Sequence, residues 1–156
     1  MENRNKLEKF LSHISIVGVG ISIILIVLIS YLSLISSDRL SAINYLPFGD
    51  KGAHMIAYAT LGVFLYFAFV RLAFNKHHEN RDLFESNWIV LPWVFTLVVG
   101  VTIGTIIEFI QKTVGRQFEV LDIISDGLGL LVGCAIGFYI LKLFLRIIIK
   151  EDSSNE

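Results

Sequence analysis

The sequence predicts an all-α integral membrane protein, a bundle of four transmembrane helices with both termini in the cytoplasm. The first observation is composition, since 54% of the 156 residues are hydrophobic and 17% are charged, with a mean hydropathy of +0.70. This balance is too apolar for a soluble domain of this length. The second observation is that the apolar residues form long runs, each able to cross about 30 Å of hydrocarbon as a helix. We treat residues 1–156 as a single domain.

The predicted spans cover residues 14–37, 53–74, 88–110 and 123–149. The first span carries no charged residue and follows a basic segment. Its apolar core is longer than the roughly 7 to 15 residues of a signal peptide, so we interpret it as an uncleaved anchor. Trp88 and Trp93 mark the entry of the third span, because tryptophan is enriched where membrane meets water.

Basic residues predict the orientation. Most of the Lys and Arg residues lie before the first span, around the connection between the second and third, or near the end of the fourth. The positive-inside rule therefore places both termini in the cytoplasm. With four spans, one set of polar residues then converges on the extracytoplasmic face: Asp50, Lys51, His54, Glu108, Gln111, Arg116, Asp122 and Asp126.

The second span opens with three polar residues on one helix face. Asp50, His54 and Tyr58 are spaced by four, which aligns them along a helix. Asp50 could cap the helix N-terminus, and Tyr58 could have a packing or interfacial role. His54 requires a polar partner, because a titratable ring one turn inside a membrane helix is costly to leave alone.

The third span ends in a similar stripe. Gly100, Gly104 and Glu108 are spaced by four, and Gln111 follows three residues later. Small residues on one face predict a second helix packed closely against it. The stripe therefore becomes polar where the helix leaves the membrane.

The fourth span reverses this order, because its polar residues come first. Asp122 and Asp126 precede Gly129, Gly133 and Gly137 at spacings of four and three, all on one face. Asp122 could be an N-cap, whereas Asp126 lies a turn deeper, where a buried partner explains it better. This face is predicted to pack inside the bundle, with a polar pocket at its mouth.

These residues together form a recognisable pattern. It comprises Asp50-Lys51-x-x-His54-x-x-x-Tyr58-x-x-Leu61-Gly62, then Glu108-x-x-Gln111, Gly115-Arg116, and Asp122 ahead of Gly127, Gly129 and Gly133. Over about residues 47–137 the chain resembles the VanZ-like membrane proteins. The resemblance implies a multi-pass protein of the bacterial cytoplasmic membrane, from a family linked through its founding member to resistance against teicoplanin. One departure is Asp126, where the family pattern leads us to expect Asn.

Two functional interpretations follow from the polar residues. In the first, Lys51 and Arg116 hold the anionic headgroup of a phospholipid or a lipid-linked cell-wall precursor, since Arg suits bidentate contact with phosphate. Asp50, Tyr58 and Gln111 would complete this ligand-binding set. The expected partner is thus an envelope amphiphile in the lipid membrane.

In the second interpretation the pocket is catalytic. Glu108, Asp122 or Asp126 would act as general base or hold a divalent cation, and His54 would transfer a proton. The sequence contains no HExxH, GxSxG or P-loop motif. Enzymatic activity, metal, cofactor and oligomeric state are therefore left open.

Other classes of function have less support. The charged residues could form only an internal salt-bridge network that fixes the bundle or serves a partner protein, and transport would need an oligomer to provide room for alternating access. The adjacent His77 and His78 fit a solvated loop better than a metal site. A net charge of −1 gives no reason to expect nucleic-acid binding.

Overall fold

The computed structural model describes residues 2–34, 49–76, 90–113 and 119–153. These ranges hold four α-helices: α1 (Glu2–Leu34), α2 (Asp50–Lys76), α3 (Leu91–Thr113) and α4 (Val120–Ser153). Each helix is long and apolar enough to cross a membrane. The prediction of an all-α membrane bundle with four spans is confirmed.

At several ends that the structure describes, the helices extend further than the predicted spans. α1 begins at Glu2 rather than at residue 14, and α4 begins at Val120 rather than at residue 123. Hydropathy marks the part of a helix that lies in hydrocarbon, whereas the hydrogen bonds along the helix continue into the polar interface. Because α4 starts at Val120, Asp122 lies in the first turn of the helix.

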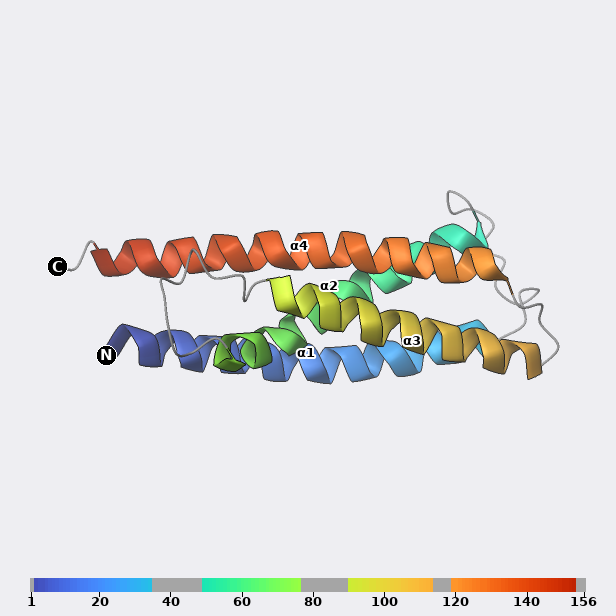
Figure 1. The fold of residues 1–156 in the computed structure, drawn as a ribbon, viewed down its shortest axis with the longest axis horizontal. Helices are drawn as coiled ribbons and strands as arrows, with labels where there is room; N and C mark the ends of the chain where they lie inside the picture. The colour runs from blue at the N-terminus through green and yellow to red at the C-terminus, as the bar shows by residue number, and fades with distance from the viewer. Residues whose placement is uncertain (1, 35–48, 77–89, 114–118, 154–156) are drawn as a thin grey trace.

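The bundle is elongated, and α2 is its central helix (Figure 1). α2 contacts α1, α3 and α4, and its most extensive interface is with α4. Figure 1 shows the start of α1 and the end of α4 at one end of the bundle. The starts of α2 and α4 and the end of α3 lie together at the other. The cytoplasmic location of the termini stays a prediction.

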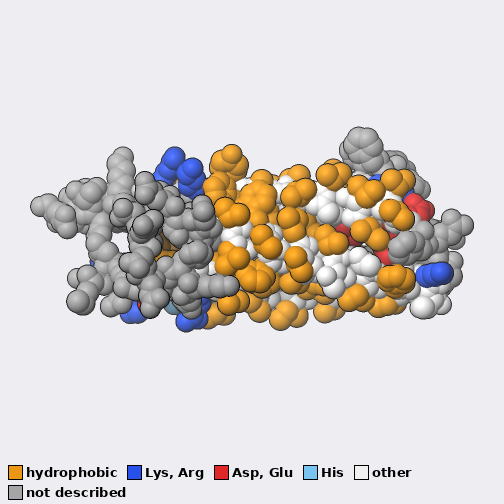
Figure 2. Space-filling model, in the orientation of Figure 1, with side chains coloured by type: hydrophobic (Ala, Val, Ile, Leu, Met, Phe, Trp, Pro, Cys, Tyr) orange, Lys and Arg blue, Asp and Glu red, His pale blue; other side chains and the backbone are white. Residues whose placement is uncertain are grey.

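The surface between the two ends is apolar. Large hydrophobic side chains on all four helices are exposed, among them Ile24 of α1, Leu72 of α2, Val98 of α3 and Leu143 of α4. On the face shown in Figure 2 hydrophobic side chains cover the middle of the bundle, and charged side chains lie toward its ends. This is the distribution expected of a surface that contacts lipid.

The backbones of α2 and α4 meet along a glycine seam, which we define as Gly62, Gly129 and Gly133. A Cβ atom at Gly133 would overlap the Ala59 carbonyl oxygen, and one at Gly129 would overlap that of Met55. From the α2 side, a Cβ at Gly62 would come within 2.9 Å of the Leu130 carbonyl oxygen. The predicted packing of this glycine face inside the bundle is therefore confirmed.

Candidate functional site

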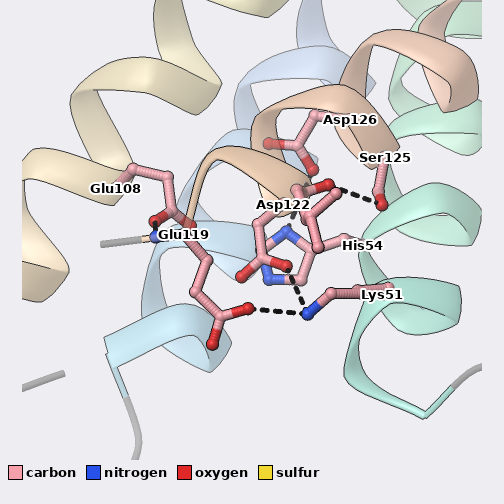
Figure 3. A network of polar contacts seen from close by, with 8 residues as sticks. Lys51, His54, Glu108, Glu119, Asp122, Ser125 and Asp126 are labelled. Carbon is pink, nitrogen blue, oxygen red and sulfur yellow. Dashed lines mark hydrogen bonds and ion pairs between the residues drawn. The ribbon is translucent and has the colours of Figure 1, made fainter. Parts of the chain in front are cut away.

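Polar side chains from three helices gather where α2 and α4 begin and α3 ends (Figure 3). We call this group the polar cluster and define it as Asp50, Lys51, His54, Glu108, Glu119, Asp122 and Asp126. Six of its members are shown in Figure 3. All except Glu119 were predicted from the sequence to lie at one membrane face.

The start of α2 places Asp50 and Lys51 at the edge of the cluster. Gly49 precedes the helix with a φ of 59°, a left-handed conformation that glycine adopts without steric cost. The Gly49 carbonyl oxygen accepts the first helical hydrogen bond, from the N–H of Ala53 at 3.2 Å. Asp50 is thus the first helical residue and not the N-cap. Its charge still suits the helix N-terminus, where the macrodipole favours an anion.

His54 and Asp126 form a buried pair between α2 and α4. The Nδ1–H of His54 donates to Asp126 Oδ1 at 2.9 Å, and the two side chains are only 8% and 1% exposed. The polar partner that the sequence analysis required for His54 is therefore Asp126. The hydrogen bond fixes the ring orientation and leaves Nε2 on the opposite side of the ring.

Tyr58 and Asp126 share the space beside Gly104 of α3. A Cβ atom at Gly104 would lie 2.7 Å from Asp126 Oδ2 and 3.2 Å from the Tyr58 hydroxyl oxygen. Tyr58 is buried, and its ring is nearly parallel to that of His54, with a centroid distance of 6.4 Å. Gly104 was predicted to allow close helix contact. Its missing side chain also leaves space for the Asp126 carboxylate and the Tyr58 hydroxyl group.

Lys51 is the exposed cation of the cluster. Its Nζ lies 2.7 Å from Glu119 Oε2 and 3.5 Å from Asp122 Oδ1. Lys51 and Glu119 have exposed fractions of 37% and 46%, whereas Asp122 has 4%. Lys51 thus lies at the water-facing edge, above a buried carboxylate.

Asp122 is not the N-cap of α4, because the helix begins two residues earlier at Val120. The N–H of Asp122 donates to the carbonyl oxygen of Glu119 at 3.1 Å. Asp122 consequently points its side chain from the first turn toward Lys51. Glu119 was not predicted as a site residue; the available signal was an acidic residue just ahead of the fourth span.

Glu108 comes from α3 and is 1% exposed. Its Oε2 accepts a hydrogen bond from the backbone N–H of Glu119 at 3.3 Å. Its Oε1 is buried and has no hydrogen bond to any residue that the structure describes. One oxygen therefore holds the start of α4, and the other has no hydrogen bond in the described ranges.

Gln111 lies at the contact between α3 and α1. Its side-chain amide donates to the Ser33 carbonyl oxygen at 3.1 Å, in a buried contact between α3 and α1. This bond links two helices that otherwise touch little. A role in orienting a ligand stays a prediction for Gln111, and Arg116 lies outside the described residues.

The charges of the cluster favour cations and protons. It holds five carboxyl groups, one lysine and one histidine. Asp126 Oδ2 and Glu108 Oε1 are buried without a hydrogen bond from the described residues. Such groups can act as bases, hold a positive charge or bind a metal ion, because an unmade buried hydrogen bond is costly.

A family model described as VanZ/LLP1 matches residues 10–145, which cover α2 and α3 completely and most of α1 and α4. No curated protein and no solved structure matches the chain.

Proposed function

This chain belongs to the VanZ/LLP1 family, and we propose that its polar cluster binds or modifies an amphiphile of the cell envelope at the extracytoplasmic face. The amphiphile would be a phospholipid or a lipid-linked cell-wall precursor. By this activity the protein would contribute to resistance against teicoplanin in a bacterial cytoplasmic membrane.

The observation that carries this proposal is the set of buried carboxyl oxygens without hydrogen bonds. Glu108 Oε1 and Asp126 Oδ2 have no hydrogen-bond partner in the described ranges. A buried acceptor left in this state costs about 1–3 kcal/mol. A cluster that served only to fix the bundle would gain from pairing these atoms. Their state is expected if hydrogen-bond donors of a bound ligand complete the cluster.

The surroundings of the cluster favour an amphiphile over a soluble ligand. Phe109 and Leu121 are the chain neighbours of Glu108 and Asp122, and they are 58% and 57% exposed. In the membrane these side chains face lipid. An acyl or prenyl chain could therefore lie along α3 and α4 while its headgroup reaches the cluster.

Lys51 supplies the positive charge for an anionic headgroup. The ammonium group is partly exposed, and its contact with Glu119 is a surface ion pair of low net strength. Phosphate could therefore displace Glu119 at little cost. Arg116, on the connection between α3 and α4, would add a bidentate contact.

If the amphiphile is also modified, His54 and Glu108 are the groups we expect to transfer protons. His54 is positioned by Asp126, in the arrangement by which carboxylates orient catalytic histidines. Glu108 has a free buried oxygen among the described contacts. Glu108→Gln keeps the shape but removes the basic group, so it should abolish modification and affect headgroup binding less.

A structural role for the polar residues is the second candidate. The hydrogen bonds from Gln111 to Ser33 and from Glu119 to Glu108 join different parts of the bundle. Gln111 fits this role better than ligand binding. Glu108 Oε1 does not fit it, because this oxygen has no hydrogen bond to a described residue.

The deciding experiment is an inventory of co-purifying lipids. We would isolate the wild-type protein and the Lys51→Gln and Arg116→Ala variants in mild detergent and identify bound molecules by mass spectrometry. Lys142→Gln is the matched control, since it removes one lysine charge at a position about 33 Å along α4 from the start of that helix. A specific phosphate-bearing amphiphile should be retained by wild type and control and depleted at least tenfold in both variants.

Equal amounts of unselected lipid in all four samples would contradict headgroup binding and favour the structural role. The same variants should be compared for teicoplanin susceptibility at matched protein levels in the membrane. Wild-type and Lys142→Gln cells should tolerate more teicoplanin than cells with Lys51→Gln. Equal susceptibility of wild-type and Lys51→Gln cells would show that the polar cluster does not contribute to resistance.

A further inference from the structure

Three members of the polar cluster have the arrangement of metal ligands. Asp50 and His54 come from successive turns of α2, and Asp122 comes from the first turn of α4. One donor atom from each lies within 4.8 Å of the other two. In a tetrahedral Zn²⁺ site the donors are roughly 3.3 Å apart, since each bond is about 2.0 Å. Small side-chain rotations would therefore close the set around an ion.

A second observation, independent of the acidic charge, points to a metal. Asp126 accepts a hydrogen bond from His54 Nδ1 at 2.9 Å and is itself 1% exposed. Metal-binding histidines usually donate their other ring N–H to a carboxylate, which fixes the ring and increases its ligand strength. The nitrogen left for an ion is Nε2, whose ring edge lies beside the Asp122 carboxylate in Figure 3.

Asp122 is a carboxylate prepared for such an ion. Its side chain is buried, and its Oδ1 has no hydrogen bond to a described residue. The nearby Lys51 Nζ contacts Oδ1 only at 3.5 Å, whereas it lies 2.7 Å from Glu119. Lys51 can therefore stay paired with Glu119 while Asp122 turns toward a metal ion.

We propose that Asp50, His54 and Asp122 form a binding site for a divalent first-row transition-metal ion. A mixed set of one imidazole and two carboxylates suits Zn²⁺ or Mn²⁺ better than Mg²⁺, which prefers oxygen ligands alone. Three protein ligands leave at least one coordination position open, as in catalytic rather than structural sites. The open position would face Lys51 and the exposed edge of the cluster.

The site does not depend on the proposed function, because it requires no amphiphile. If both hold, the ion supplies the positive charge that an excess of carboxylates lacks for binding phosphate. The two proposals fail separately, since metal binding is measured with the ion alone and lipid binding is measured on the purified membrane protein.

The test is a titration with Zn²⁺ by isothermal calorimetry, followed by elemental analysis of the metal bound per chain. The protein is to be purified without a polyhistidine tag. All measurements use the His77→Ala/His78→Ala variant as the background, because this histidine pair could bind Zn²⁺ on its own. After treatment with EDTA, this protein should bind one Zn²⁺ per chain. Mg²⁺ in place of Zn²⁺ should bind at least 100-fold more weakly.

Asp50→Asn and Asp122→Asn should each weaken Zn²⁺ binding by at least about 100-fold, the upper end of the effect of altering an outer-shell partner. Glu8→Gln is the matched control, because it removes one carboxyl charge from α1 at the opposite end of the bundle. It should leave affinity and stoichiometry unchanged. Circular dichroism and thermal unfolding would verify that the variants fold. Asp50→Asn should disturb folding less than Asp122→Asn, because Asp50 is only half-buried in the first turn of α2.

Absence of Zn²⁺ binding to the folded wild-type background would overturn the proposal. Binding of one Zn²⁺ with the same affinity in Asp50→Asn and Asp122→Asn would also overturn it, because the ion would then lie elsewhere. Equal affinity for Mg²⁺ and Zn²⁺ would overturn the assignment to a transition metal.

Discussion

The α2–α4 interface has two parts, the glycine seam in its middle and the polar cluster at its end. In the seam the backbones touch, and a methyl group at Gly133 would overlap a carbonyl oxygen of α2. In the cluster the same two helices are joined by side chains, with His54 and Asp126 bonded at 2.9 Å. One helix face thus changes from backbone contact to charged contact within two turns.

The difference separates stability from activity along one interface. Close contact of small residues is the main source of helix association in membranes, where burial of apolar side chains adds little. Buried ion pairs, by contrast, often contribute no more than an apolar replacement would. We therefore expect the glycine seam to hold the bundle together and the polar cluster to be retained for function.

The strongest test of this separation is Gly133→Ala. The added Cβ would meet the Ala59 carbonyl oxygen and the Gly62 Cα, and both are backbone atoms that cannot rotate away. The helices must move apart, and we expect a loss of about 3 kcal/mol in the free energy of unfolding. Unfolding in mixed detergent micelles, followed by circular dichroism, would measure it.

Gly127→Ala provides the matched control for that substitution. It lies on the same helix, and a Cβ there would meet no atom of the described residues within 4 Å, apart from its own helix backbone and chain neighbours. It should be neutral or stabilising by up to about 1 kcal/mol. If Gly133→Ala were as stable as Gly127→Ala, the seam would not be the source of stability.

His54→Leu should have the next largest effect. It removes the ring N–H that bonds Asp126 Oδ1, and we expect a loss of about 2 kcal/mol in the free energy of unfolding. Adding Asp126→Leu should recover most of this stability, because no buried charge then remains. The double variant should nevertheless bind neither Zn²⁺ nor amphiphile. Greater instability of the double variant would mean that the pair stabilises the bundle after all.

Asp126→Asn should have the smallest effect on folding. The Asn oxygen can still accept from His54 Nδ1, so we expect a change below about 1 kcal/mol. Loss of the negative charge should weaken Zn²⁺ binding about tenfold, as outer-shell changes do. This variant restores the residue expected from the family pattern. A large loss of stability with unchanged Zn²⁺ affinity would mean that Asp126 stabilises the bundle and does not support metal binding.

The fold could be predicted from the sequence because apolar length and small-residue spacing report directly on membrane helices. The stripe containing Gly129 and Gly133 indicated the face that packs in the bundle, and this was confirmed. Helix ends were less predictable. α4 begins at Val120, ahead of the predicted start at residue 123, and this moves Asp122 out of the capping position.

The site could be predicted only in part. Spacing identified Asp50, His54, Glu108 and Asp126 as residues of one membrane face. It could not pair His54 with Asp126, 72 positions later, because pairing depends on how two helices are turned against each other. For the same reason the contact of Gln111 with Ser33 was unexpected. Glu119 was missed because it lies outside every apolar run.

The division of the cluster between α2 and α4 also has a consequence for biogenesis. α2 emerges from the ribosome well before α4, so His54 enters the bilayer while Asp126 is still unsynthesised. Until the fourth helix inserts, the histidine lacks this hydrogen-bond partner. Nascent chains truncated between α3 and α4 are therefore the species that membrane quality control should recognise and degrade.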